Sequence, residues 1–173
     1  MPAPMRMNVS AFVLWQRAIA AQEEPTRAAL LWQQLLLEEG DAAIGADAAR
    51  QVAEQAIEAL IGQHGRSIYA AVEDRAAAAL RAARDEATAL RRVTRDYPNS
   101  LAAARAGLTL LDRAVEDGDL GAAAVVMARA ARADQLTPSV MRRVQVAALR
   151  RGNLPLARAM ATRLERGPDQ PSD

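Results

Sequence analysis

Apolar residues recur at spacings of three and four along most of this chain, which is the period of an amphipathic α-helix. Phe12, Trp15, Ala18 and Ile19 form the first such stripe. Capping residues and helix breakers bound the stripes and predict nine helices, at about residues 10–22, 25–40, 47–61, 67–80, 85–97, 100–114, 119–130, 138–148 and 156–164. No segment alternates apolar and polar positions over β-branched residues as a strand does, so the pattern predicts an all-α fold.

Helix N-termini are expected at residues whose side chains accept hydrogen bonds from the first free backbone N–H groups. These residues are Ser10, Asp47, Ser67, Asp85, Ser100, Asp119 and Thr137. Pro25 and Pro138 suit the first turn of a helix, where the missing N–H is not needed. The run Gly62–Gly65 predicts the end of the helix that starts at Asp47, which places His64 in a turn.

Three predicted turns in the second half of the chain are spaced 34 residues apart. They lie at Arg84-Asp85, Gly118-Asp119 and Gly152-Asn153. Glycine adopts a positive φ after a helix without steric cost, and a neighbouring Asp or Asn caps the helix that follows. A small residue follows each turn at the same offset, namely Ala89, Ala123 and Ala157, as close packing of paired helices requires. The recurrence predicts a helical repeat.

From Arg84 onward the chain resembles tetratricopeptide repeats, especially the degenerate bacterial kind in which Tyr-Pro-Asn-Ser joins successive units, as Tyr97–Ser100 does here. The positions that fit the family pattern are Leu110, Gly118, Ala123, Ala130, Val144, Gly152 and Ala157. The positions that depart from it are Gly107, Leu111, Met141 and Gln145. The resemblance implies antiparallel helix pairs stacked as a right-handed solenoid, which an irregular N-terminal helical hairpin precedes.

The length of 173 residues suits one domain or a short superhelix of four to five helix pairs. We therefore expect a single helical-repeat domain over 1–166, with an irregular helical part at 1–83 and a repeat-like part at 84–166. The remaining segment, 167–173, is rich in Pro and has nothing to bury, so it is expected to be disordered.

Composition narrows the classes of function. Hydrophobic residues make up 51% and charged residues 25% of the chain, which is a globular balance. The absence of Cys excludes disulfides and thiolate metal sites. The apolar run Val9–Trp15 is too short for a signal-peptide core, which favours the cytoplasm, and no run approaches the ~20 residues that cross a bilayer. We therefore expect no membrane insertion.

Candidate catalytic groups are few. His64 is the only His, and it lies between two glycines with no ligand pattern around it. Three acidic pairs occur, at Glu23-Glu24, Glu38-Glu39 and Glu73-Asp74. Consecutive helical residues point about 100° apart, so these pairs do not converge on a metal or a substrate. No Gly-rich phosphate loop follows a strand. We expect no catalytic, cofactor or metal site, and no enzyme.

Charge is distributed unevenly: residues 1–80 carry a net charge of −4 and residues 81–173 a net charge of +5. The basic half either binds an acidic partner or nucleic acid, or attracts the acidic half within or between chains, or forms a solvated face. The best candidate patch combines Arg142-Arg143 with Arg150-Arg151. Because few aromatic residues are present to stack on bases, we expect no nucleic-acid partner.

The first functional hypothesis is a non-catalytic protein–protein interaction or scaffold module with a concave helical surface. The first helix of each pair would line that surface and contact an acidic protein or peptide segment, through Arg105, Thr109, Arg113, Arg142 and Arg143.

The alternative is a structural or self-assembling subunit of a larger bacterial complex, a homo-oligomer included. Residues 67–131 also resemble helical spacer segments beside quinoprotein-like β-propeller repeats. Self-association would use the ends of the stack or the hairpin that carries Trp15 and Trp32. Each tryptophan shares a stripe with Leu or Ile, so we expect both to pack between the first two helices.

Overall fold

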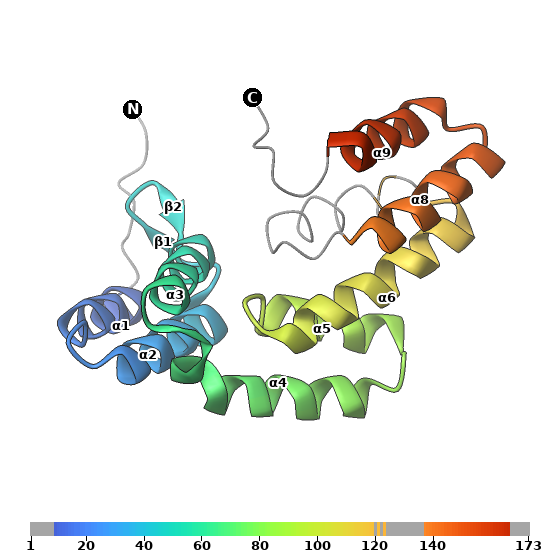
Figure 1. Cartoon of the computed structure of the whole chain (residues 1–173). Coiled ribbons are helices and arrows are strands. Elements are labelled where there is room, and N and C mark those ends of the chain that lie inside the picture. The colour runs from blue at the N-terminus through green and yellow to red at the C-terminus, as the bar shows by residue number, and fades with distance from the viewer. Residues whose placement is uncertain (1–8, 120, 122, 124–136, 167–173) are drawn as a thin grey trace, which may run out of the picture. The chain divides into compact units, whose positions relative to one another are not determined.

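The structure, a computed structural model, describes residues 9–119, 121, 123 and 137–166, and this part of the chain is mostly helical (Figure 1). Its α-helices are α1 (Val9–Ala20), α2 (Pro25–Glu39), α3 (Ala49–His64), α4 (Ala70–Ala83), α5 (Ala87–Asp96), α6 (Leu101–Asp117), α8 (Pro138–Arg150) and α9 (Leu154–Arg166). A short 3-10 helix, η1 (Arg66–Tyr69), precedes α4. Two strands, β1 (Ala43–Ile44) and β2 (Asp47–Ala48), pair antiparallel between α2 and α3. The all-α prediction is confirmed, with this small hairpin added to it.

Two expectations fall outside the described residues. Of the helix expected from Asp119, only residues 119, 121 and 123 are described, and the rest lies outside. The tail 167–173 lies entirely outside. Within the described ranges, no helix is long and apolar enough to cross a membrane.

The chain divides into two compact units. Unit 1 comprises Met1–Arg84 and Arg92–Ala103, and unit 2 comprises Asp85–Arg91 and Ala104–Asp173. Both α5 and α6 therefore contribute residues to both units. The single domain over 1–166 stays a prediction.

The core of unit 1 is built around α2, which packs against both α1 and α3 (Figure 1). Leu35 and Leu36 of α2 are fully buried, together with Ile57 of α3 and Val72 of α4. Small residues line the helix interfaces and let the helices approach closely. These are Ala11 and Ala18 in α1, Ala28 and Ala29 in α2, and Ala49 and Ala53 in α3. Most of the core is therefore aliphatic, as expected of a chain with few aromatic residues.

The tryptophans differ in burial. Trp32 belongs to the core of unit 1, as expected. Trp15 is only half-buried at the edge of that core, and its ring stacks on Phe12 with centroids 5.5 Å apart. The expectation that Trp15 packs inside the hairpin is therefore only partly right, because smaller residues on the neighbouring side of α1, Ala11 and Leu14, take the interior positions.

Two predictions at the ends of α3 were wrong. Asp47 does not cap this helix, because it lies in β2, and Ala48 at the N-cap makes no side-chain bond. The helix also continues through Gly62 and ends at His64, so His64 is its last residue rather than part of a turn. Gly65 ends it with a φ of +80°, a conformation that glycine adopts without strain.

Two further helix starts are shifted. Ser67 lies within η1, and α4 begins only at Ala70. In α5, the Glu86 carboxylate accepts hydrogen bonds from the backbone N–H groups of Thr88 (2.8 Å) and Ala89 (2.6 Å), in the role expected of Asp85. Asp85 instead adopts a φ of +63° in the preceding turn.

The three turns spaced 34 residues apart are confirmed as turns, and they share a backbone conformation. Arg84, Gly118 and Gly152 have φ values of +42°, +75° and +71°. They follow the ends of α4, α6 and α8. Arg84 thus repeats the left-handed conformation of the two glycines without being a glycine.

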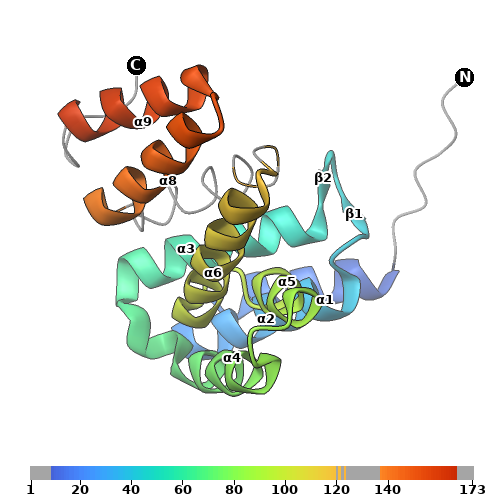
Figure 2. The ribbon, with the colours of Figure 1, turned by 90° about the vertical axis from the view of Figure 1, so that its right-hand side faces the viewer.

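Unit 2 contains a second aliphatic core, in which α8 and α9 lie side by side (Figure 2). Its members are Leu111 and Ala114 of α6, Ala123, Val140, Met141 and Val144 of α8, and Met160 of α9. The expected cap of α8 is confirmed, because the Thr137 hydroxyl accepts from the Val140 N–H at 3.3 Å. The Asn153 side chain likewise accepts from the Leu156 N–H at 3.0 Å and starts α9.

Candidate interaction surface

Three of the expected contact residues lie on α6, spaced four residues apart along one side. Arg105 is exposed, whereas Thr109 and Arg113 are half-buried. The Thr109 hydroxyl donates a hydrogen bond to the carbonyl of Arg105 at 3.2 Å. This hydroxyl is therefore used within its own helix, and Arg105 is the most accessible of the three.

The other two expected residues, Arg142 and Arg143, are exposed on α8. Arg143 Nη1 forms an ion pair with Asp112 Oδ2 of α6 at 3.1 Å. The two side chains are 57% and 41% exposed, so solvent screens the pair and it contributes about 1 kcal/mol or less. The structure thus brings Arg143 next to α6, while Arg142 points about 100° away around the helix.

The exposed side of α8 combines arginines with aliphatic residues. Val146 and Leu149 are 47% and 53% exposed, and they follow Arg142 by four and seven residues. Arg150 lies eight residues after Arg142. This spacing places all four on one side of the helix, and we call Arg142, Val146, Leu149 and Arg150 the α8 face.

The opposite side of α8 is buried, as its core members Val140, Val144 and Ala148 show. No Asp or Glu occurs within α8. Among the described residues, Arg142 and Arg150 form no ion pair. The α8 face therefore presents positive charge around an aliphatic centre.

Arg151 does not belong to this face. Its Nη2 donates to the carbonyl of Glu116 near the C-terminus of α6. The same guanidinium covers Gly118, where an added Cβ would lie 2.5 Å from Arg151 Nη1. The guanidinium of Arg151 therefore satisfies a free carbonyl at the end of α6. Arg150, the other residue of the predicted pair, lies on the α8 face.

Sequence reasoning missed Val146, Leu149 and Asp112. The first two were detectable, because they continue the helical spacing from Arg142 on a side that the core residues do not occupy. The Asp112–Arg143 pair was not detectable, because its residues are 31 positions apart and only folding brings them together.

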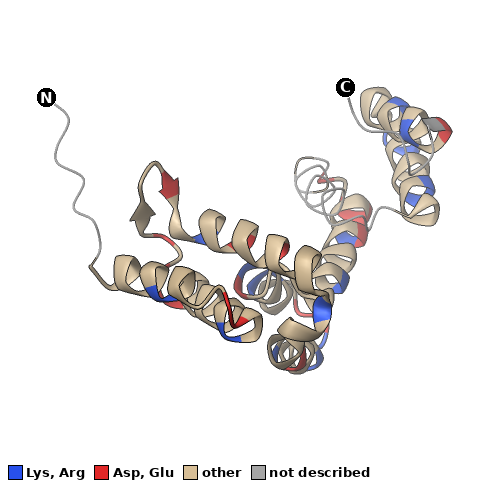
Figure 3. Cartoon of the chain, turned by 60° about the vertical axis from the view of Figure 1, so that its left-hand side comes forward, with Lys and Arg blue, Asp and Glu red and all other residues tan. Residues whose placement is uncertain are grey.

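Charge is concentrated around the α8 face. The segment 138–166 contains seven arginines and one acidic residue, Glu165. Figure 3 shows basic residues along both α8 and α9. This hairpin carries most of the positive charge that distinguishes the second half of the chain.

The buried polar groups of unit 1 are structural. The Tyr69 hydroxyl donates to Gln33 Oε1, and Gln33 Nε2 donates to the carbonyl of Asp96 at 2.7 Å. Burial raises the pKa of Tyr69 well above its usual value, and the nearby negative charge of Glu73 raises it further. Tyr69 is therefore a neutral hydrogen-bond donor at the centre of a satisfied network.

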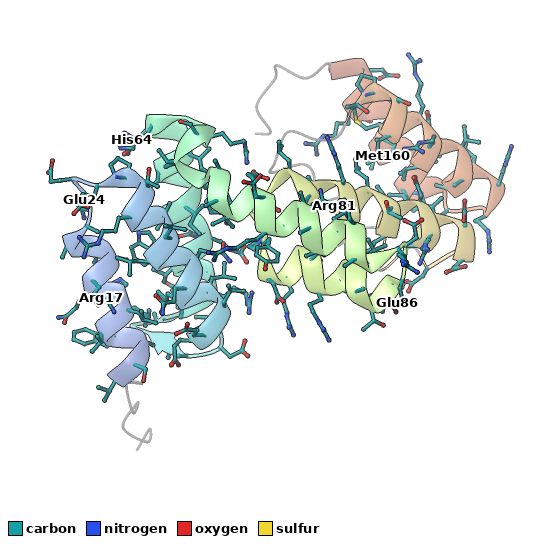
Figure 4. The ribbon with its side chains drawn as sticks, turned by 90° about the horizontal axis from the view of Figure 1, so that it is seen from below. Arg17, Glu24, His64, Arg81, Glu86 and Met160 are labelled. Carbon is teal, nitrogen blue, oxygen red and sulfur yellow. The ribbon has the colours of Figure 1, made fainter. Side chains whose placement is uncertain are left out.

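Two acidic residues of unit 1, Glu73 and Glu24, have structural partners. Glu73 pairs with Arg66 at 2.7 Å and accepts from the Leu101 N–H at 3.0 Å, and Glu24 pairs with Arg27 at 2.9 Å. Figure 4 shows His64, which is exposed at the end of α3. Within the described residues, no group of three or more His, Cys, Asp or Glu is placed to hold a metal ion.

Comparison of the chain with models of protein families, with curated proteins and with solved structures finds no match in any of the three. The functional argument therefore rests on the residues of this chain.

Proposed function

We propose that this protein is a non-catalytic protein–protein interaction module, built as a tetratricopeptide-like stack of helix pairs, that binds an acidic segment of a protein partner. The observation that carries the proposal is the α8 face, where two exposed aliphatic residues lie between arginines on a helix without acids. Val146 and Leu149 are exposed together on this side of α8, and contiguous exposed apolar surface rimmed by polar residues is typical of interaction sites.

The recurring turns support the repeat part of the proposal. Arg84, Gly118 and Gly152 share a left-handed backbone at intervals of 34 residues, and each follows a helix end. α8 and α9 contact one another and form a helical hairpin across the turn at Gly152. A right-handed stack would place the first helix of each pair, α6 and α8, along a concave surface.

Recognition would combine two forces. Val146 and Leu149 bury apolar surface against aliphatic residues of the partner, which supplies affinity. Arg142 and Arg150 attract carboxylates that flank those residues, which supplies orientation and accelerates association. A helix with Leu every three or four residues and Glu beside them meets both requirements. On α6, Arg105 would supply a further positive charge, whereas the charge of Arg143 is balanced by its pair with Asp112.

Titration with designed peptides tests this function. The probe is a fluorescent acidic amphipathic peptide with that Leu and Glu pattern, and a scrambled peptide of the same composition accompanies it. The variant is Arg142→Glu with Arg150→Glu. The matched control is Arg158→Glu with Arg163→Glu, which makes the same charge change at exposed positions of α9.

At low salt we expect the α8 variant to bind the patterned peptide at least tenfold more weakly, and the α9 variant less than threefold more weakly, by fluorescence anisotropy. Equal losses in the two variants would indicate general anion attraction and contradict a docking face. Equal affinity for the scrambled peptide or for single-stranded DNA would contradict it as well. Absence of any binding by the unaltered chain would overturn the proposal.

A further inference from the structure

α2 carries exposed leucines on the side away from its core contacts. Leu30 is 36% exposed and Leu37 is 45% exposed. They are seven residues apart, which is close to two helical turns, so they lie on one side of the helix. The half-buried Gln34 lies between them on the same side. The opposite side is buried in the core of unit 1, as Leu35 and Leu36 show.

Acidic residues flank these leucines. Glu38 directly follows Leu37 and is exposed, and its carboxylate accepts a hydrogen bond from Gln34 Nε2 at 3.1 Å. Glu23 lies just before the helix and Asp41 just after it, and both are exposed. Among the described residues, these three acids form no ion pair. Their negative charge is therefore open to a partner.

The exposed side of α2 lies in a strongly acidic segment. We call this side the α2 face, and it consists of Leu30, Gln34, Leu37 and Glu38. The segment 23–41 contains five acidic residues and one basic residue, Arg27, which pairs with Glu24 at 2.9 Å. Its net charge of −4 equals that of residues 1–80 as a whole. The segment 138–166, which contains the α8 face, has a net charge of +6.

The α2 face has the features that the α8 face requires of a partner. The α8 face surrounds two exposed aliphatic residues with positive charge, and the α2 face surrounds two exposed leucines with negative charge. Each surface therefore complements the other. Neither complements itself, because like charges opposed across a contact repel, and this disfavours the pairing of two α8 faces or of two α2 faces.

We infer that the acidic partner of the α8 face is the α2 face of a second copy of this chain. The inference rests on the proposed function and names the partner of that same surface. Every copy offers one face of each kind, so both are present at equal concentration wherever the chain is. A contact between two different surfaces of identical subunits is heterologous, and association through it proceeds to a dimer or beyond.

The contact is expected to be weak and sensitive to salt. One helix against another is a small interface compared with the about 800 Å² that each partner buries in a stable complex. We therefore expect association at low salt at protein concentrations of about 0.1–1 mM. It should be lost at 1 M salt, where charges are screened beyond about 3 Å.

Analytical ultracentrifugation of the full chain at low salt measures the association. The α8 variant carries Val146→Gln and Leu149→Gln, and it keeps the α2 face. The α2 variant carries Leu30→Gln and Leu37→Gln, and it keeps the α8 face. These changes remove apolar surface without altering the charge, so general charge attraction is the same in every sample.

The matched control makes the same kind of change on another helix of unit 1. It carries Val9→Gln and Val13→Gln, at positions of α1 that are 76% and 46% exposed. Because all of the altered side chains are exposed, the three variants are expected to fold, and circular dichroism checks this. Weakening by the control equal to that by the α2 variant would indicate general apolar association and contradict the inference.

Mixing the two variants gives the sharpest result. We expect the mean mass of the unaltered chain and of the control to rise to that of a dimer or beyond with concentration. The α8 variant alone and the α2 variant alone should each associate at least fivefold more weakly. An equal mixture of the two should recover association, because the intact α2 face of the first binds the intact α8 face of the second. Unweakened association of either variant, or a mixture that stays monomeric, would contradict the pairing.

The patterned acidic peptide separates this inference from the proposed function. We expect the α2 variant to bind that peptide within threefold of the affinity of the unaltered chain, because its α8 face is intact. An unaltered chain that binds the peptide but stays a monomer at 1 mM would overturn the inference and leave the proposed function standing. A monomeric chain that binds no peptide would overturn both. Association that is unchanged at 1 M salt would contradict the role of charge.

Discussion

The C-terminal carbonyls of two helices, α5 in unit 1 and α6 in unit 2, are satisfied by different means. In unit 1, distant side chains bind the carbonyls at the end of α5. Gln33 Nε2 donates to Asp96 at 2.7 Å, and Arg50 Nη1 donates to Arg95 at 2.6 Å. In unit 2, the end of α6 has a local turn at Gly118 and the single guanidinium of Arg151, which donates to the carbonyl of Glu116.

This difference shows two ways of satisfying the free carbonyls at a helix end. The end of α5 has no glycine, and its carbonyls depend on side chains of α2 and α3 that are already ordered by the core. The end of α6 in unit 2 has a left-handed residue at Gly118, and the same kind of turn recurs at Gly152 after α8 and, within unit 1, at Arg84 after α4. The first solution is specific to one site, and the second is repeatable.

Truncation of core leucines should lower the free energy of unfolding more than the changes to polar contacts that follow. Leu36 of unit 1 and Leu111 of unit 2 are both fully buried. We expect Leu36→Ala and Leu111→Ala each to lower the free energy of unfolding by about 2–5 kcal/mol, because each leaves a cavity. Urea denaturation measures the loss. A loss below about 1 kcal/mol at either site would show that its core does not contribute as its burial implies.

Tyr69→Phe tests the buried polar network of unit 1. The change removes the hydroxyl that donates to Gln33 Oε1, and it leaves that oxygen buried without its donor. We expect a loss of about 1–3 kcal/mol in the free energy of unfolding. A loss near zero would mean that unit 1 does not depend on this network.

The same substitution has a pH signature. Burial raises the pKa of Tyr69 above the ordinary value of 10.0, so the folded chain keeps this proton at a pH where the unfolded chain releases it. The stability that Tyr69 contributes is therefore complete below pH 10 and falls as the pH rises above 10. We expect the difference in unfolding free energy between the unaltered chain and Tyr69→Phe to shrink above pH 10. A constant difference would contradict the raised pKa.

A pair of glycine substitutions tests the helix end in unit 2. Gly118→Ala and Gly152→Ala both place a side chain at a positive φ, which costs about 1–2 kcal/mol each. Only Gly118→Ala also displaces Arg151, because no described residue lies within 4 Å of the Cβ position at Gly152. We expect Gly118→Ala to lower the free energy of unfolding by about 1 kcal/mol more than Gly152→Ala does, as measured by thermal unfolding. In an Arg151→Met background the two costs should become equal, and a persistent difference would exclude Arg151 as its cause.

The smallest effect is expected from the surface ion pairs. Asp112→Asn removes the partner of Arg143 in unit 2, and Glu24→Gln removes that of Arg27 in unit 1. We expect each to cost about 0.2–1 kcal/mol at low salt and close to nothing at 1 M salt. Denaturation at the two salt concentrations measures both. If Asp112→Asn still lowers the free energy of unfolding at high salt, Asp112 stabilises the packing of α8 on α6 through contacts other than its charge.

The features that could be predicted from the sequence are those set by near neighbours. Thr137 caps α8 through a group three residues away, and Ser100 caps α6 in the same way, accepting from the Ala103 N–H at 3.0 Å. The predictions at Asp47 and Asp85 were wrong although each residue can cap a helix and lies close to a helix start. In the folded chain each of these helices begins in another way. At Asp47 a β-hairpin formed, and at Asp85 the carboxylate of Glu86 was used instead.

The candidate surfaces were predictable only in part. Arg142 and Arg143 were identified as a basic patch, and both are exposed on α8. Their different environments were not foreseen, because the Asp112 partner of Arg143 lies 31 residues earlier in the chain. The α2 face was also missed, because a run of leucines such as Leu35–Leu37 gives no indication of which of them the core will cover.

By itself, the sequence determined the helices and the three turns after α4, α6 and α8, because hydrophobic period, capping and positive φ act over a few residues. Tertiary structure alone decided which side of each helix is covered. In α1 the smaller side, with Ala11 and Ala18, became the interior because it permits close approach to α2, and Val9 and Val13 remained outside. Burial depends on contacts between distant residues, and these contacts exist only once the helices have packed.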